Sequence, residues 1–226
     1  MAQKRQEADR SPLTRQRVLD AAIALADRVG IEPFTIRKLA AELDVTPMAI
    51  YHHVPNKEQI LDGIVDEVFE QIELPPEDLE WSAAMRVRCC SAREVLARHP
   101  WAPPLMESRT SPGPATLGHH DAVLGCLRAG GLPWTLVAHA YAVLDSFVYG
   151  FALQEANLPF GDATDVGEVT ETVIQPLSAE EFPNLVAFTG EHVLQPGYDF
   201  GRSFEFGLDL ILAGLTREAD NHRRHA

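Results

Sequence analysis

Cysteine and long hydrophobic runs are both scarce in this chain of 226 residues. Its three cysteines, of which Cys89 and Cys90 are adjacent, are too few for a dense set of disulfides. We therefore expect a reducing compartment, the cytoplasm. No uncharged apolar run approaches the roughly 20 residues that a membrane-spanning helix needs, and no apolar segment follows the basic N-terminus to form a signal peptide. These absences exclude the secreted, membrane-spanning and disulfide-stapled classes, so we expect no membrane partner.

Lysine is also rare, and its position in the chain is informative. All three lysines, Lys4, Lys38 and Lys57, lie in the first 60 residues, which carry 9 Lys+Arg against 8 Asp+Glu. The remaining residues carry 10 against 25, so they hold nearly all of the net charge of −14. A polyanion is repelled by the larger part of the chain and tolerated by the smaller part. This asymmetry permits DNA binding in one orientation.

Alternating apolar and polar stretches long enough for a sheet are missing. Apolar residues recur instead every three or four positions, which predicts an all-α fold. In the first helix, Ser11-Pro12 predicts the start, because a hydroxyl cap and a proline at the first helical position both favour it. Gly30 predicts the end, as glycine usually stands just past the last helical residue.

Two short helices separated by a sharp turn are predicted next. Thr35 caps the first of them, and Thr46-Pro47 predicts the start of the second, over 47–53. Asp44 stands where the chain must turn, and aspartate tolerates the left-handed conformation better than most residues. Asn56 then caps a long fourth helix, over 56–74, with a strongly apolar face. A helix, a turn of about three residues and another helix form the helix-turn-helix arrangement.

The second short helix has no formal charge, which is unusual for a solvated surface. Ile50 and Val54 suffice to attach it to the core, so its small, hydroxylic and aromatic residues face elsewhere and suit an approach to bases and phosphates. One alternative is a set of short helices in an ordinary helical core. Another is a metal site on His52 and His53, although adjacent residues diverge by about 100° around a helix.

The segment VGIEPFTIRKLAAELDVTPMAIYHHVPNKEQIL resembles the DNA-binding domain of the tetracycline-repressor (TetR) family, and the resemblance covers about residues 12–72. It implies that Arg37 reaches a base or phosphate, that the Pro-Met-Ala segment at 47–49 lies against base edges, and that Tyr51, His53 and Lys57 contact phosphates. Asp44 departs from the glycine more usual at the turn, and the Thr-Pro-Met-Ala segment leaves the operator sequence open. The predicted DNA-binding residues are Thr35, Arg37, Thr46, Pro47, Met48, Ala49, Tyr51, His52, His53 and Lys57.

The rest of the chain also has helical periodicity. Leu74-Pro75-Pro76 separates two domains, a DNA-binding domain with its linking helix over 11–74 and a helical domain over 75–220. We expect a disordered arm over 1–10, a loop through Pro103-Pro104, a surface loop over 159–170 and a disordered tail over 221–226. The predicted helices of the second domain cover 81–98, 114–129, 133–157, 178–194 and 199–219.

The two longest of these helices, 133–157 and 199–219, are too apolar for the surface of a monomer. One apolar face of each serves the domain core and a second face needs a partner. Two such helices from each of two subunits close a four-helix bundle, which predicts a homodimer. The alternative is a central helix that is buried on all sides.

This second domain resembles the C-terminal domain of repressors related to the tetracycline repressor, through RHPW at 98–101, LRAGGL at 127–132, FVYGFALQE at 147–155 and FEFGLDLILAGL at 204–215. The resemblance implies a dimerisation bundle and a ligand cavity in each subunit. The family's magnesium-binding histidine and glutamate align with Met106 and Gln154, and neither is a good Mg²⁺ ligand. We therefore expect no metal site and no cofactor.

The cavity is expected to bind a small apolar or amphipathic effector. The predicted lining residues are Met85, Trp101, Met106, Phe147, Phe151 and Gln154. Aromatic residues and methionines at helical spacing are as readily explained as plain core. His119, His120 and His139 could orient a ligand, and Cys89-Cys90 could sense redox state or be simply buried thiols.

Together these features predict a homodimeric transcriptional repressor that binds double-stranded operator DNA and is released by a small molecule. No G-x-S-x-G, Walker or Rossmann pattern occurs, so we expect no catalytic residues and no enzyme activity. Two alternatives stay open, a regulator or DNA-organising protein without a ligand, and a helical enzyme with an incidental helix-turn-helix. The identity of the effector, the operator and the regulated genes is left open.

Overall fold

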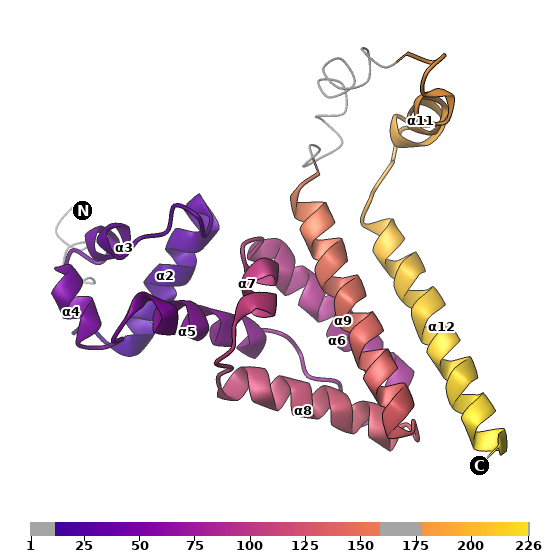
Figure 1. Ribbon diagram of the computed structural model, residues 1–226, viewed down its shortest axis with the longest axis horizontal. Helices are drawn as coiled ribbons and strands as arrows, with labels where there is room; N and C mark the ends of the chain where they lie inside the picture. The colour runs from indigo at the N-terminus through magenta and orange to yellow at the C-terminus, as the bar shows by residue number, and fades with distance from the viewer. Residues whose placement is uncertain (1–11, 159–177, 226) are drawn as a thin grey trace, which may run out of the picture.

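The computed structural model describes residues 12–158 and 178–225, and every regular element in these ranges is helical (Figure 1). The helices are α2 (Arg15–Val29), α3 (Ile36–Glu42), α4 (Pro47–Tyr51), α5 (Lys57–Glu70), α6 (Trp81–Arg98), α7 (Ala102–Ser108), α8 (Pro114–Ala129), α9 (Trp134–Ala156), α11 (Pro183–Phe188) and α12 (Arg202–His225), with a π-helical turn at Thr189–Val193. This confirms the predicted all-α fold class. The predicted arm over 1–10 and the predicted loop over 159–170 lie outside the described residues.

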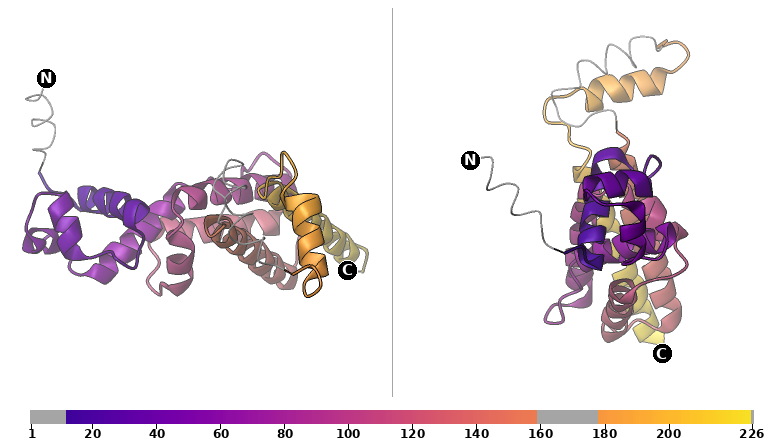
Figure 2. Two further views of the ribbon diagram at one scale, coloured as in Figure 1. Left: turned by 90° about the horizontal axis from the view of Figure 1, so that it is seen from above. Right: turned by 90° about the vertical axis from the view of Figure 1, so that its left-hand side faces the viewer.

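Helices α2, α3 and α4 form a small N-terminal unit, which we call the head and which lies at one end of the molecule (Figure 2). Phe34, Leu39 and Ile50 are fully buried in its centre. The first helix begins at Arg15 rather than at Ser11-Pro12 as predicted. Thr14 supplies the cap, since its hydroxyl accepts a hydrogen bond from the backbone N–H of Arg17 at 3.2 Å. A cap only has to place an oxygen over the first turn, and Thr14 does so.

Helix α5 connects the head to the C-terminal helices and belongs to the core of both (Figures 1 and 2). It packs on α2, α7 and α8. Its apolar side chains are buried along its whole length, from Ile60 and Ile64 to Val68 and Phe69. Helix α5 therefore joins the core of the head to that of the C-terminal domain.

The C-terminal domain is built on α9, which packs against α6, α8 and α12. Helix α12 runs antiparallel to α9 (Figure 1). The ring of Phe147 stacks on Phe204 with centroids 5.3 Å apart, and Phe151 stacks on Phe200 at 4.7 Å. A Cβ atom on Gly207 would lie 2.6 Å from the Phe147 ring, so glycine is what lets the two helices approach this closely.

Three predicted boundaries in this domain are wrong. The loop predicted through Pro103-Pro104 is helix α7, because proline is tolerated in a first helical turn, where no N–H is needed. Ser178 does accept from the backbone N–H groups of Glu180 and Glu181, but this is a turn, and helix α11 begins only at Pro183. The tail predicted to be disordered over 221–226 is helical as far as His225. An Asp220–Arg223 ion pair at 3.5 Å supports this last turn.

Among the described residues, α9 alone is long and apolar enough to span a bilayer, judged by length and composition only. Half of its apolar window is buried inside the protein. It also contacts α6, α8 and α12 and carries Asp145, which forms an ion pair with Arg88. These contacts are those of the central helix of a helical domain, which passes the same test.

Candidate DNA-binding surface and ligand pocket

The turn between α3 and α4 has the geometry expected of a helix-turn-helix. Asp44 has a φ of 52°, in the left-handed region, as predicted from the sequence. Thr35 and Thr46 cap the two helices, by accepting from the backbone N–H groups of Lys38 at 3.2 Å and Ala49 at 3.3 Å. Each cap satisfies a backbone donor that the helix itself leaves free. The orientation of α4 is thus determined by contacts close together in the sequence.

Helix α4 is attached to the head by one side only. Ile50 is fully buried and Val54, just after the helix, is nearly so. On the other side Met48 is 65% exposed. The other predicted DNA-contacting residues of this segment are exposed as well, except for the half-buried Ala49, and these are Thr46, Pro47, Tyr51, His52 and His53.

The remaining predicted DNA contacts flank this helix. Thr35 and Arg37 are exposed at the start of α3. Lys57 is half-buried at the start of α5, where its ammonium group donates to the carbonyl oxygen of Phe34 at 3.0 Å and lies 5.7 Å from the Phe34 ring centroid. An ammonium group has three N–H donors, so this bond leaves others for a phosphate. The predicted residues are therefore exposed or half-buried, and Arg37 and Lys57 are the basic ones among them apart from the histidines.

A pocket of about 420 Å³ lies in the C-terminal domain, between α5, α7, α8 and α9. Val65 and Phe69 of α5, Met106 of α7 and Ala142 of α9 give it apolar walls. Its polar and loop residues are Asp62, Glu107, Arg109, Thr110, Ser111, Pro112, Gly113, Thr116, His120, Tyr141, Asp145, Ser146 and Tyr149. The pocket thus combines apolar walls with convergent polar groups, a combination that small-molecule sites share.

Behind one wall of this pocket lies a buried charge cluster. Arg88 of α6 is fully buried, and its Nη1 lies 2.7 Å from Oδ1 of Asp145, which lines the pocket. Arg88 Nε also donates to Nε2 of His119 at 2.9 Å. Burial and, to a smaller extent, the neighbouring Arg88 charge lower the pKa of His119 to about 3, so the imidazole is neutral. The cluster therefore holds one positive and one negative charge.

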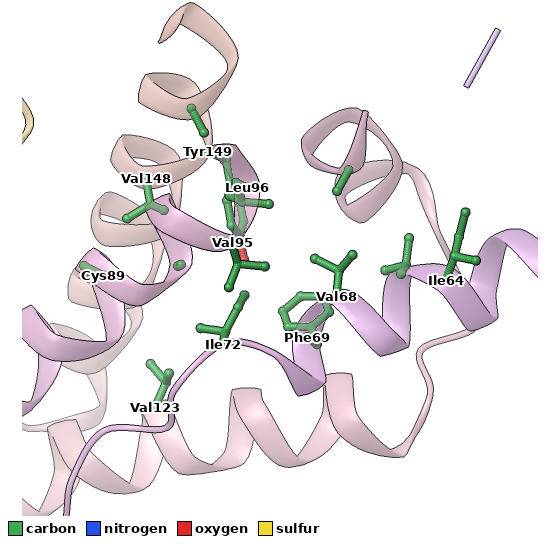
Figure 3. Close-up of a cluster of buried hydrophobic side chains, with 14 of the residues drawn as sticks. Ile64, Val68, Phe69, Ile72, Cys89, Val95, Leu96, Val123, Val148 and Tyr149 are labelled. Atoms are coloured by element: carbon green, nitrogen blue, oxygen red, sulfur yellow. The ribbon is translucent and has the colours of Figure 1, made fainter. Parts of the chain in front are cut away.

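Two tyrosines flank Asp145 on the same helix. Tyr141 Oη lies 2.7 Å from Nδ1 of His120. Burial and Asp145 raise the pKa of Tyr141 to about 12, and they raise that of Tyr149 further. Tyr149 is 8% exposed, and its hydroxyl has no hydrogen-bond partner among residues 12–158 and 178–225. Figure 3 shows Tyr149 in the cluster that includes Val68 and Phe69 of α5.

The six residues predicted to line the cavity do not meet in this pocket. Met106 lies in its wall. Met85 is buried in the core of α6, Phe147 and Phe151 pack against α12, and Gln154 is exposed. Trp101 lies at the boundary with the head, because its Nε1 donates to Oδ1 of Asp27 at 2.6 Å. Helical spacing shows which residues share a face, but it does not show which neighbouring helix covers that face.

The sequence reasoning missed Tyr141, Asp145 and Tyr149, although a signal was present. These three polar residues stand four positions apart in a mostly apolar helix, a spacing that places them on one face. Of the histidines considered as ligand-orienting groups, His120 lies in the pocket, His119 lies behind it and His139 is exposed.

The adjacent cysteines differ in their surroundings. Cys89 is buried and Cys90 is half-buried, and neither forms a disulfide. Burial raises the pKa of the Cys89 thiol to about 11, against a smaller opposing effect of Arg88. A thiol is a poor nucleophile compared with a thiolate, so this environment disfavours the redox-sensing alternative at Cys89.

A second, wider hollow of about 1060 Å³ lies between the 74–81 segment and α8, with Arg223 at its edge. It is lined by residues of the linker and α8 rather than by α5. The described residues contain no group of three His, Cys, Asp or Glu side chains that could hold a metal ion.

Polar contacts tie the pocket to α5. Arg109 lies 2.7 Å from Glu58 and 3.0 Å from Asp62, both on α5. Asp66, one turn further, accepts from the backbone N–H and the hydroxyl of Thr116 at 2.8 and 2.9 Å and so caps α8. Asp62, Arg109 and Thr116 of these contacts also line the pocket.

Comparisons with known proteins agree with this geometry. A family model described as "Bacterial regulatory proteins, tetR family" matches residues 18–64, and one described as "Tetracyclin repressor-like, C-terminal domain" matches residues 74–219. The chain is 34% identical over 215 residues to the HTH-type transcriptional repressor DrrR1 of Streptomyces coeruleorubidus, which covers 90% of this chain and 77% of the relative.

Solved structures are also similar to this chain over most of its length. The structure of apo ActR from Streptomyces coelicolor is similar with a TM-score of 0.74 and 30% identity, over 94% of this chain and 99% of that one. The structure of ActR in complex with actinorhodin is similar with a TM-score of 0.72 and 30% identity, over 92% and 99%. The matches cover both the head and the C-terminal domain.

Proposed function

Since the chain belongs to the TetR family of bacterial transcriptional regulators, we propose that it is a homodimeric repressor that leaves its operator when a small molecule enters the pocket between α5, α7, α8 and α9. Members of this family are regulators and not enzymes, which removes the helical-enzyme alternative. We assign residues 11–74 to DNA binding and residues 75–220 to dimerisation and ligand binding. As a regulator of transcription, it works in the cytoplasm and needs no membrane.

For DNA binding, each subunit places α4 in the major groove of one half-site. Pro47, Met48 and Ala49 then lie against base edges, while Tyr51, His53 and Lys57 hold phosphates. Thr35, Arg37, Thr46 and His52 complete the contact surface. The exposed, uncharged face of α4 supports this assignment, because a face made only for solvent is normally charged.

For dimerisation, α9 and α12 each present apolar residues that the described residues leave uncovered. Phe206 and Leu210 of α12 are 67% and 60% exposed. Val143 and Leu153 of α9 are 45% and 43% exposed. A second copy that packs the same two helices against these faces buries all four side chains and closes a four-helix bundle.

For ligand release, α5 provides the mechanical link. It forms one wall of the pocket through Asp62, Val65 and Phe69, and its first turn carries Lys57 of the DNA-binding surface. A ligand that fits the pocket better when α5 is shifted lowers DNA affinity, since it stabilises the conformation that no longer matches the two half-sites. The proposal rests mainly on the observation that α5 both lines the pocket and carries Lys57. The ActR complex with actinorhodin supports it by similarity.

The test of the DNA part is a gel shift of the purified protein on the DNA that flanks its own gene, over a series of salt concentrations. We expect tight binding whose affinity falls steeply with salt. The double variant Tyr51→Ala with Lys57→Ala should bind more weakly and with a salt slope reduced by about 1 or more. Unchanged affinity in this folded variant would contradict the assigned surface.

The test of the ligand part is release of that DNA by small apolar and amphipathic compounds. Release by one compound, with the dimer intact in sedimentation, supports a ligand-released repressor. Tight DNA binding that no compound relieves points to the alternative, a regulator without a ligand. For the dimer, Phe206→Glu with Leu210→Glu should give monomers, whereas Leu117→Glu on the exposed side of α8 should not.

A further inference from the structure

The beginning of α4 presents its side chains to solvent. Ile50 is fully buried, whereas Met48, two positions earlier and so about 200° around the helix, is 65% exposed. Thr46 and Pro47 are exposed beside it, and Ala49 is half-buried. Helix α4 also lies at the outer end of the head, away from the C-terminal domain (Figure 1). Met48 is therefore the side chain of this segment that lies opposite the core.

No side chain over 46–49 can form a pair of hydrogen bonds to a base. Such pairs are made by Asn or Gln with adenine and by Arg or Lys with guanine, while Asp and Glu accept from cytosine. The segment contains none of these residue types. The Thr46 hydroxyl already accepts from the backbone N–H of Ala49 at 3.3 Å, and the thioether of Met48 is only a weak acceptor. Hydrogen bonding from this segment to bases is therefore weak.

The segment offers apolar surface, and the major groove has one apolar group that matches it. This group is the C5-methyl of thymine, which cytosine, adenine and guanine lack. Contact between the methyl group and Met48 is favourable because it removes apolar surface from water. Over the other bases, the same side chain would cover hydrogen-bonding groups and leave them without partners. The segment therefore favours thymine.

The backbone beneath Met48 is held in place, as a contact with a single methyl group requires. Dispersion attraction is largely lost when a gap of about an ångström opens, so the helix that makes such a contact has to be fixed. Ile50 and Val54 anchor α4 in the core of the head. Pro47 at the first helical position has a restricted φ. The flexible, polarisable methionine side chain can then adjust to the methyl group.

We propose that Met48, flanked by Pro47 and Ala49, reads the C5-methyl group of a thymine in each operator half-site. The inference rests on the proposed function, because it takes α4 to lie in the major groove. It adds the chemical feature of the operator that α4 recognises, and it assigns this recognition to an apolar side chain.

Replacement of thymine by uracil in the bound DNA tests the proposal, since uracil pairs like thymine and lacks only the methyl group. The probes are synthetic duplexes of the stretch that the full-length protein protects in the DNA flanking its own gene, each with one thymine replaced. We expect one or two positions in each half-site at which uracil weakens binding about three- to tenfold. A change of less than about twofold at every position would overturn the proposal.

Variants at position 48 show whether Met48 is the reader. Met48→Ala shortens the side chain, so the ratio of affinities for thymine and uracil at the sensitive positions should fall to near 1. Met48→Leu keeps an apolar side chain of similar volume and should retain a ratio of about three or more. A ratio that persists in Met48→Ala would overturn the assignment, because uracil would then act through another side chain or through the shape of the DNA.

Two further variants are matched controls. Met48→Gln keeps the length of the side chain but ends in an amide, so it should lose the preference for thymine over uracil. Arg37→Ala removes an exposed cation of the same surface and should weaken binding to both duplexes while the ratio stays unchanged. Loss of the ratio in Arg37→Ala as well would contradict the assignment to Met48. All these variants change exposed residues, and melting followed by circular dichroism checks that they fold.

The same gel shifts separate this inference from the proposed function. If the protein binds no DNA specifically, the proposed function fails and this inference fails with it. If the protein binds the duplex and a small molecule releases it, but uracil changes nothing, the proposed function stands and this inference fails.

Discussion

The head and the C-terminal domain satisfy their polar groups in different ways. In the head, Thr14, Thr35 and Thr46 each accept from a backbone N–H three residues further along, so the bonds are local. The buried polar and charged side chains among the described residues all lie in the C-terminal domain, and they are Arg88, His99, Thr116, His119, Asp145 and Thr189. Several of them bond across helices.

This difference suits the head to reading DNA and the C-terminal domain to responding to a ligand. A unit held together by local caps and an apolar core moves as a rigid body, and a DNA-reading surface needs such rigidity. A domain with polar groups bonded between helices has more to gain or lose when a ligand replaces one of those partners. The comparison leads to four predictions, from the largest expected effect to the smallest.

The largest effect is expected from breaking the buried ion pair. Arg88→Leu leaves the Asp145 carboxylate without its partner and should lower the free energy of unfolding by about 3–5 kcal/mol in urea denaturation. Arg28→Ala removes an exposed ion pair with Glu42 in the head and should cost at most about 1 kcal/mol. Similar losses in the two variants would show that the domains do not differ in this respect.

The two sides of α4 should separate stability from DNA binding. Ile50→Ala opens a cavity in the core of the head and should lower stability by about 2–5 kcal/mol. Met48→Ala alters an exposed residue and should change stability by less than about 0.5 kcal/mol, but weaken operator binding several-fold. Denaturation curves and gel shifts on both variants check this, and a large stability loss in Met48→Ala would contradict it.

Acid should destabilise the protein through His119. Burial lowers the pKa of this histidine to about 3, against about 6.5 when unfolded, so below pH 6.5 the unfolded chain binds more protons. Stability is then lost as the pH falls from 6.5 toward 3, by up to about 2 kcal/mol between pH 7 and pH 5. His119→Gln keeps an acceptor for Arg88 and should flatten this part of the curve in urea denaturation at each pH. A curve of unchanged slope would rule His119 out as the cause.

The smallest effect is expected at the contact between the domains. Trp101→Phe removes the hydrogen bond to Asp27 of α2 and should leave folding and operator affinity intact while changing the effector concentration needed for release two- to fivefold. Trp134→Phe, at an exposed position on α9, is the matched control and should change nothing. The same response in both variants would mean that the Asp27 contact does not couple the domains.

Much of the head was predictable from the sequence because its signals are local. Asp44 adopts the left-handed conformation expected of it, and Thr35, Thr46 and Asn56 cap the helices expected of them. In the C-terminal domain, the helices 81–98 and 114–129 begin and end at the predicted residues. Each of these features depends on contacts within about four residues, which the order of residues specifies directly.

The pocket was predictable only in part. Met106, expected to line a cavity, lies in the wall of the pocket, but the proximity of Tyr141, Asp145 and Tyr149 to Arg88 of α6 and His120 of α8 follows only from the packing of the helices. Trp101 was expected in the cavity and instead contacts the head, because α7 folds over α5 and changes which side of the chain is covered.

The sequence by itself determined the family, the helical class, the order of the helices and the uncharged face of α4, because each follows from periodicity, caps and composition. Only the tertiary structure decided which polar residues share a pocket, which charges neutralise each other and where Trp101 lies. The physical reason is that these relations join residues 20 to 75 positions apart. Their energy depends on how α5, α6, α8 and α9 pack, and no local pattern encodes that packing.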